Sequence, residues 1–194
     1  FARGRDRVRC VAVIERRGVC GEERPALGLT EATGRAAYHI VPPERRGDFD
    51  VWVGYENNNA QYDCWVHGGA GDDAFHDKLP GYETDALTDL FIDYIRSRAA
   101  TPGASDENTP FFAALSVQPP HGPYVAPEDW MRRHTPGGIT FRANVPDVPR
   151  VREQAMRSLA GYYAMIENLD WNIGRIRQAL VESGLEDDPH IVFF

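Results

Sequence analysis

The sequence of 194 residues contains one lysine, Lys78, three cysteines and no long run of apolar residues. Three cysteines are an odd number without framework spacing, so we do not expect a disulfide scaffold. The longest apolar runs, such as residues 111–117, are too short to cross a bilayer, so we expect no membrane span. The chain begins without a methionine or an apolar signal core, so no targeting segment is visible and the compartment stays open.

Basic residues are also in the minority, with 21 against 29 acidic residues and a net charge of -8. A nucleic-acid-binding protein needs a basic face, so we do not expect nucleic acid as a partner. The hydrophobic content of 42% is ordinary for a globular protein. The length fits one domain of ordinary size.

The charge is distributed unevenly along the chain. Residues 1–46 hold ten arginines and six acidic residues, a local charge of +4, whereas the rest of the chain carries -12. Residues 11–14 can form a short strand, but arginines and a glycine follow at once and no amphipathic period is sustained. Two interpretations stay open: a basic arm, or a start that is poorly ordered or non-homologous to the rest.

From Gly47 onward the apolar pattern predicts an alternation of strands and helices. We expect strands at 49–54, 110–118 and 190–194, and helices at 83–99, 127–133 and 152–183, the last ended by Gly184. The second and third strands read as continuous apolar runs, which is typical of strands buried on both faces of a parallel sheet. This alternation predicts an α/β layered fold with a mostly parallel sheet.

A histidine follows the strand that ends near Gln118. The sequence Pro-Pro-His-Gly-Pro at 119–123 places His121 where open α/β sheets bind ligands, beyond the carboxyl end of a strand. The neighbouring prolines restrict the backbone, so the imidazole has little entropy left to lose. Such a histidine can donate to an anionic oxygen or act as a general acid. The residues alone leave a second interpretation open, a loop histidine that satisfies nearby backbone groups.

A zinc site can be imagined at Cys64 and His67 together with His76 and the Asp72–Asp73 pair. Structural zinc sites generally use four well-spaced cysteine or histidine ligands, and the sequence contains no second pair of this kind. We therefore assign no metal ligand.

Several motifs, in order along the chain, resemble the sulfatase family. Residues 110–127, Pro-Phe-Phe-Ala-Ala-Leu-Ser-Val-Gln-Pro-Pro-His-Gly-Pro-Tyr-Val-Ala-Pro, resemble its strand and Pro-His-x-Pro loop. Residues 166–175 match the Ile-Glu-x-x-Asp-x-x-Ile-Gly-Arg core of its long helix, and residues 83–95 match the helix before it. Residues 47–68 resemble one bacterial branch of the family. The similarity extends from about residue 34 to residue 194.

The resemblance implies an alkaline-phosphatase-like fold and hydrolysis of sulfate esters. Residues 35–194 are then the central part of the catalytic domain, incomplete at both ends, and residues 1–34 are an atypical Arg-rich segment. The family uses formylglycine, made from cysteine in a C-x-[PA]-S-R motif, and a divalent cation, usually calcium. Its Pro-His-x-Pro histidine contacts the sulfate and corresponds to His121. The implied partner is a small-molecule or carbohydrate sulfate ester, and the oligomeric state stays unassigned.

Other family motifs do not match. Cys20-Gly-Glu-Glu-Arg24 keeps a cysteine and an arginine but lacks the middle of C-x-P-S-R. Neither Lys78 nor His39 fits the Gly-Lys-Trp-His-Leu segment, and the Asp-His-Gly metal loop would follow residue 194. We therefore expect a sulfuric ester hydrolase fragment that is inactive alone, without complete cofactor sites. The alternatives are a non-catalytic remnant of a disrupted sulfatase gene and a phosphate or phosphonate ester hydrolase of the same superfamily.

Polar and aromatic residues at 57–65 are weaker candidates for substrate binding. Asn58, with Asn57 and Asn59, can bind the hydroxyl groups of a sulfated sugar, although consecutive asparagines are also typical of a turn. Tyr62 and Trp65 can stack on a sugar ring or pack in the core.

Overall fold

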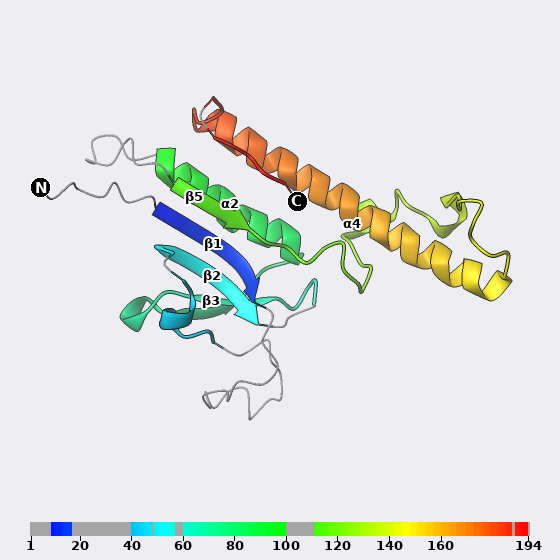
Figure 1. Ribbon diagram of the computed structural model, residues 1–194, viewed down its shortest axis with the longest axis horizontal. Helices are drawn as coiled ribbons and strands as arrows, with labels where there is room; N and C mark the ends of the chain where they lie inside the picture. The colour runs from blue at the N-terminus through cyan, green and yellow to red at the C-terminus, as the bar shows by residue number, and fades with distance from the viewer. Residues whose placement is uncertain are drawn as a thin grey trace, which may run out of the picture.

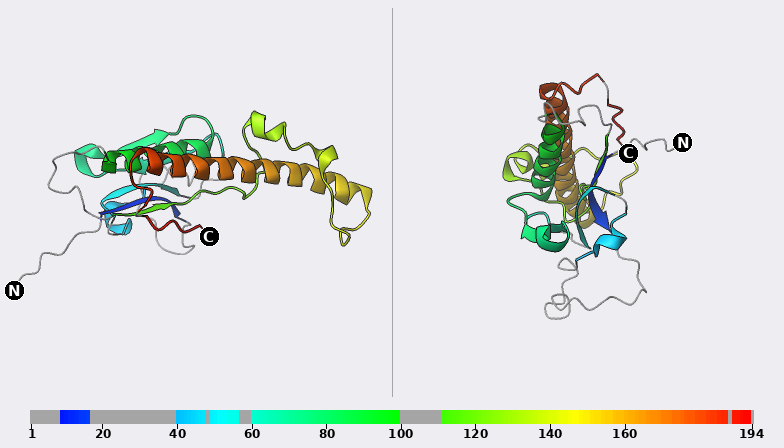
Figure 2. Two further views of the ribbon diagram at one scale, coloured as in Figure 1. Left: turned by 90° about the horizontal axis from the view of Figure 1, so that it is seen from above. Right: turned by 90° about the vertical axis from the view of Figure 1, so that its left-hand side faces the viewer.

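The computed structural model describes residues 9–16, 40–47, 49–56, 60–99, 111–187 and 189–193, and for residues 9–16, Glu56 and Ala99 only the backbone. A five-stranded sheet carries two long helices on one face (Figures 1 and 2). This agrees with the predicted α/β layered fold. None of the helices in these ranges has the length and apolar character that crossing a membrane requires.

The sheet has the order β4-β3-β2-β1-β5. Its strands are β1 (Arg9–Arg16), β2 (Val51–Glu56), β3 (Trp65–Gly68), β4 (Phe75–Lys78) and β5 (Phe111–Leu115). The strands β2, β1 and β5 are parallel, β3 is antiparallel to β2, and β4 is antiparallel to β3. The carboxyl ends of β1, β2 and β5 therefore lie at the same edge as the start of β3 and the end of β4. We call this the carboxyl edge.

The strand β1 lies at the centre of the three parallel strands. It is longer than the strand expected at 11–14 and pairs Val11 with both Val51 and Ala113. For residues 9–16, the interpretations as a basic arm or a poorly ordered start are therefore wrong. The proposed division of the chain at residue 34 stays a prediction, since residues 1–8 and 17–39 lie outside the described ranges.

The helices agree closely with the periodicity. The helix α2 (Glu83–Ala99) has the predicted bounds, α3 (Glu128–Met131) is shorter than expected, and α4 (Pro149–Glu182) begins on a proline, which suits the first helical turn. Three 3-10 turns complete the described helices: η2 (Pro43–Arg45), η3 (Gly71–Asp73) and η4 (Pro136–Gly138). Gly184, with φ of 65°, ends α4 as predicted. Both Figure 1 and Figure 2 show α4 extending well beyond the sheet.

The main apolar core lies between the sheet and the two long helices. It consists of Tyr55, Cys64, Val66, Leu79, Ala86, Leu87, Phe91, Ile95 and Leu180. Burial of such side chains contributes about 1.5–3 kcal/mol each, which makes this layer the main source of stability. The apolar stripe predicted for α2 faces this core through Leu87, Phe91 and Ile95, whereas the stripe predicted for α4 reaches it only near the end of the helix, at Leu180. Farther from the sheet, Tyr163 and Ile166 of that stripe are exposed, at 40% and 39%.

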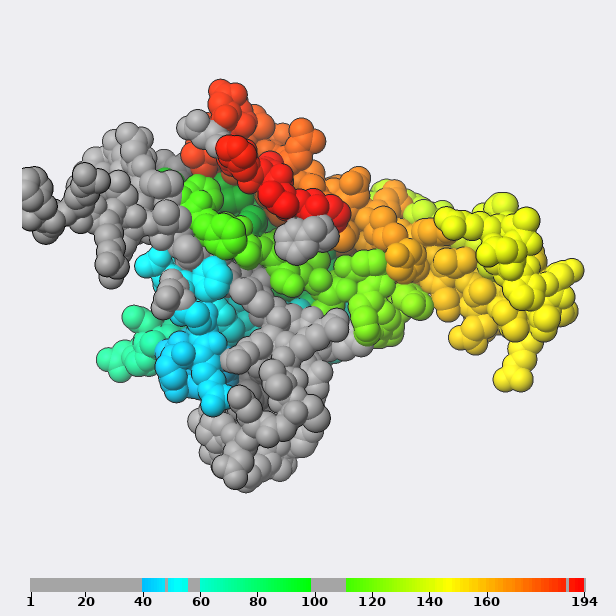
Figure 3. Space-filling model, in the orientation of Figure 1, coloured from blue at the N-terminus to red at the C-terminus, as the bar shows by residue number. Residues whose placement is uncertain are grey.

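Two strand predictions fail at the uncovered side of the sheet. The strand β5 is not buried on both faces, because Phe112 points away from the helices and is 54% exposed. Residues 190–193 do not form a strand, and Val192 and Phe193 are more than 70% exposed, at 76% and 72%. In the space-filling view this C-terminal segment lies on the outer surface (Figure 3). An apolar run reports hydrophobicity alone, and burial also requires neighbours on both faces, which the described elements do not supply here.

The first turn of α2 is tied to α4 by buried amides. Asn168 and Asn172 are 0% and 1% exposed, and their Nδ2 atoms donate to Oδ1 of Asp85 at 2.9 and 2.7 Å. Arg175 donates to Oδ1 of Asn172 at 2.9 Å. Because unpaired buried polar groups are costly, this network favours one register of α4 on α2.

Gly161 lets the loop after β5 cross α4. A Cβ on Gly161 would lie 2.2 Å from the carbonyl oxygen of Tyr124, whereas a Cβ on Gly174, in the same helix, would meet nothing within 4 Å. We expect Gly161→Ala to lower the free energy of unfolding by about 1–3 kcal/mol, since the loop must move away. The control Gly174→Ala should raise it by up to about 1 kcal/mol through helix propensity. Urea denaturation measures both, and equal effects would contradict the proposed close approach.

Glu167 joins α4 to the residues that follow α3. Its Oε1 accepts from Nη1 of Arg133 at 2.8 Å, and its Oε2 lies 2.7 Å from Nε2 of His134. The hydrogen bond from Arg133, with a smaller contribution from His134, lowers the pKa of Glu167 below the ordinary 4.5.

A depressed carboxyl pKa contributes stability above the unfolded-state value, and this contribution is lost as the pH falls through the folded value. We expect Glu167→Gln to cost less than about 1 kcal/mol at neutral pH, because the pair is exposed. The difference from wild type should shrink as the pH falls below 4.5. Chemical denaturation across pH, with Glu153→Gln as the control for a pair within α4, measures this. A difference that does not change with pH would refute it.

Candidate functional site

The loop after β5, residues 116–127, carries His121 at the carboxyl edge, as the strand prediction requires. His121 is exposed, and its backbone N–H donates to the carbonyl of Gln118 at 3.0 Å. Its ring Nδ1 lies 2.7 Å from the carbonyl oxygen of Gly122. Because a carbonyl can only accept, Nδ1 must carry the hydrogen of this bond. Across the described residues, Nε2 of His121 has no hydrogen-bond partner.

The two interpretations of His121 therefore concern different atoms. The Nδ1 atom satisfies a local backbone carbonyl, and the Nε2 atom is available to solvent or a ligand. With Nδ1 as the donor, neutral His121 presents an acceptor at Nε2, and the imidazolium presents a donor suited to an anionic oxygen.

Three consecutive carbonyls of this loop are held from outside it. Nε2 of Gln61 donates to the oxygen of Pro123 at 3.1 Å, and the hydroxyl of Tyr82 donates to the oxygen of Val125 at 3.1 Å. The oxygen of Tyr124, between them, lies against Gly161. Gln61 precedes β3 and Tyr82 follows β4, so both come from the carboxyl edge. The backbone around His121 is thus fixed by segments distant in sequence.

Tyr124 is the exposed aromatic side chain nearest to His121 in sequence. Its side chain is 42% exposed, and its ring lies 3.7 Å from where a Cβ on Gly122 would be. The ring also meets that of Tyr162 edge-on, with 6.0 Å between ring centroids. An aromatic ring held this way offers an apolar surface on the same loop as His121.

Tyr62 and Trp65 differ in their environment. Tyr62 is 47% exposed and its ring centroid lies 5.4 Å from that of Tyr82. Partial burial, together with the charge of Asp85, raises the pKa of Tyr62. Trp65 donates to Asp63 at 3.3 Å and its ring lies 5.3 Å from that of His76. Tyr62 is therefore the more exposed of the two, and Trp65 is the more firmly packed.

Other residues considered from the sequence fall outside the described ranges. These are Asn57, Asn58, Asn59, Cys20, Arg24 and His39. The strand β2 ends at Glu56, directly before Asn57. The role of Asn58 stays a prediction.

The imagined zinc ligands have other roles. Cys64 is buried in the main core, and Nε2 of His67 accepts from the backbone N–H of Val41 at 2.8 Å. Burial lowers the pKa of His76, whose ring lies 6.1 Å from that of His67. In the ranges that the structure describes, no three histidine, cysteine, aspartate or glutamate side chains are grouped as a metal site.

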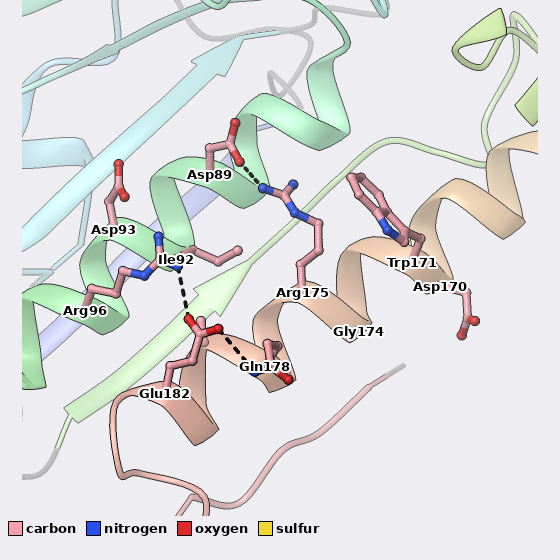
Figure 4. A pocket seen from close by; sticks show the side chains of 11 residues that line it. Asp89, Ile92, Asp93, Arg96, Asp170, Trp171, Gly174, Arg175, Gln178 and Glu182 are labelled. Carbon is pink, nitrogen blue, oxygen red and sulfur yellow. Dashed lines mark hydrogen bonds and ion pairs between the residues drawn. The ribbon is translucent and has the colours of Figure 1, made fainter. Parts of the chain in front are cut away.

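An open groove of about 730 Å³ lies between α2 and the C-terminal half of α4 (Figure 4). Asp89 pairs with Arg175, and Arg96 with Glu182 at 3.2 Å, across this groove. Gln178 also donates to Glu182 at 3.1 Å. The groove starts at Asp89, the seventh residue of α2, and follows both helices away from the carboxyl edge. It is therefore separate from the His121 loop.

The sequence interpretation missed Gln61 and Tyr82. Prolines at 119, 120, 123 and 127 leave the loop with fewer N–H groups than carbonyl groups. Carbonyl groups that pack against other elements need donors, so a proline-rich loop that is packed in this way takes hydrogen bonds from other segments. The proline content of the loop therefore predicts that donors from other segments exist, but it does not identify them.

Comparison with known proteins gives consistent matches. A family model described as Sulfatase matches residues 30–194. The Ulvan-active sulfatase of Formosa agariphila is 26% identical over 172 residues, which are 82% of this chain and 29% of that protein. An Endo-4-O-sulfatase of Bacteroides thetaiotaomicron is 25% identical over 164 residues, 79% of this chain and 30% of that protein.

A solved structure agrees in fold. The Bacteroides fragilis protein yidJ, described as a sulfatase, superposes with a TM-score of 0.63 at 24% identity, over 76% of this chain and 32% of that chain. The chain thus spans about 30% of the length of the curated relatives it matches, 29% and 30% for the two above. Since the family model covers the chain from β2 through α2, β5 and α4, this chain belongs to the sulfatase family.

Proposed function

We propose that this chain is the part of a sulfuric ester hydrolase that contacts the sulfate group through His121. The observation that carries the proposal is the oriented imidazole at the carboxyl edge, within the region that matches the family model. A sulfate ester is an anion, and its hydrolysis builds further charge on the leaving and equatorial oxygens. A protonated Nε2 donates to such an oxygen, and the Nδ1 bond to Gly122 keeps the ring directed.

The proposed substrates are small-molecule or carbohydrate sulfate esters. Tyr124 and Tyr62 support this, because both are more than 40% exposed, at 42% and 47%, and can lie against an aryl or sugar ring. Asn58 remains a proposed contact for sugar hydroxyls. The Ulvan-active sulfatase and the Endo-4-O-sulfatase are proteins of the same family that act on sulfate esters.

The family is generally dependent on a metal ion and formylglycine. The described residues do not fit either group, since no metal-ligand cluster occurs among them and Cys64, the cysteine whose side chain is described, is buried in the core. We therefore derive no step through the metal or the formylglycine. In this proposal His121 binds and orients the sulfate, and the residues that complete catalysis belong to the rest of the polypeptide.

The protein to test is the intact gene product that contains this chain, assayed with an aryl sulfate and an aryl phosphate. We expect hydrolysis of the sulfate, and a loss of about 10²–10³ in kcat for His121→Ala, the usual cost of removing one such donor. His121→Asn keeps a donor near the Gly122 carbonyl but lacks Nε2, so it should lose as much. His134→Ala, a histidine outside the loop, serves as the control.

Each possible result of these assays distinguishes between the proposed function and one of its alternatives. Equal activity of wild type and His121→Ala would remove His121 from the site. Preference for the phosphate would identify a phosphate ester hydrolase. Inactivity on both esters, with no C-x-P-S-R or Asp-His-Gly encoded around this reading frame, would identify a non-catalytic remnant.

A further inference from the structure

We infer that Gln61 and Tyr82 are positioning residues that set the direction of the His121 imidazole; this inference rests on the proposed function of His121. Among the described residues, neither side chain is hydrogen-bonded to the imidazole. Each donates to a backbone carbonyl of the loop that carries it, at Pro123 and Val125.

The loop cannot fix itself. Pro119, Pro120 and Pro123 have no N–H, so these residues donate no backbone hydrogen bond. The bonds inside the loop, from the N–H of His121 to Gln118, from the N–H of Val125 to Pro123 and from Nδ1 of His121 to Gly122, are all local and do not fix the loop against the rest of the molecule. External donors must supply the remaining constraints.

The constraint from Gln61 lies next to the bond that orients the ring. The peptide unit between residues 122 and 123 contains the Gly122 oxygen that accepts from Nδ1. Pro123 is held on its other side, where its oxygen accepts from both Gln61 and Val125 at 3.1 and 2.9 Å. Because proline also fixes its own φ, holding the Pro123 carbonyl restricts the plane of the Gly122 carbonyl. Because Nδ1 of His121 donates to the Gly122 oxygen, the orientation of the imidazole depends on that plane.

The two donors are themselves held rigidly. Gln61 is 4% exposed, and its backbone oxygen accepts from the N–H of Glu83 at 2.7 Å. Tyr82 is 3% exposed, and burial is the largest cause of its raised pKa, which keeps its hydroxyl protonated as a donor. Glu83, the first residue of α2, accepts from the hydroxyl of Tyr55 at 2.7 Å. Supporting residues locked in this way are what a precise site requires.

The test uses Gln61→Met, which keeps the length but removes the donor, and Tyr82→Phe, which removes the hydroxyl alone. In the intact protein that contains this chain, we expect each variant to lower kcat for an aryl sulfate about tenfold and the pair about 10²-fold, since small misplacements at a reacting centre are costly. The KM should change less than about twofold, because the imidazole still meets the anion. Gln178→Met, an exposed glutamine paired with Glu182, is the matched control.

A second readout does not depend on turnover. With ¹⁵N-labelled histidine, NMR reports whether Nδ1 of His121 carries a hydrogen-bonded proton. We expect this signature in wild type and Gln178→Met, and its loss or broadening in Gln61→Met.

The two readouts separate the inference from the proposed function. If His121→Ala abolishes activity while Gln61→Met and Tyr82→Phe keep the wild-type kcat, the inference is wrong and the proposed function stands. If wild type is inactive but the NMR signature depends on Gln61, the positioning is supported and the proposed function fails. An NMR signature unchanged in Gln61→Met overturns the inference in either case.

Discussion

The first turn of α2, with the tyrosine before it, is the contact on which the other parts of the structure depend. The sheet is joined to this turn by the hydroxyl of Tyr55, which donates to the buried carboxylate of Glu83 at 2.7 Å. The helix α4 reaches it through two buried asparagines that donate to Asp85. The loop after β5 reaches it through Tyr82. Because buried polar groups are costly without partners, these bonds specify one arrangement where apolar packing alone would tolerate several.

This convergence couples the fold to the candidate site. The carboxyl edge receives its histidine from β5, but the position of that histidine depends on residues that come before β3 and after β4. Gly161 adds a steric condition, since α4 approaches the loop backbone more closely than any side chain would permit. Packing of α4 and orientation of His121 are therefore two consequences of the same set of contacts.

The sequence predicts those parts that depend on local pattern. The bounds of α2 follow from its three- and four-residue period, and the place of His121 follows from the end of a strand. The exposure of Phe112 and of residues 190–193 could not be predicted, because it depends on which elements cover the sheet. The contacts of Gln61 and Tyr82 could not be predicted either, because they join segments separated by 62 and 43 residues. Local pattern determines elements, and long-range polar contacts determine the geometry of the site.

The composition of the loop explains why these long-range donors are needed. A proline-rich segment is stiff, which favours a well-placed side chain, but it has more carbonyl groups than N–H groups. The missing donors come from Gln61, from Tyr82 and from Nδ1 of His121 itself, which donates to Gly122. The hydrogen bond from Nδ1 of His121 to Gly122 thus both satisfies a backbone carbonyl and orients the imidazole. Only Nε2 then remains for chemistry, so the direction of this one nitrogen is set by the hydrogen-bond requirements of the loop that carries it.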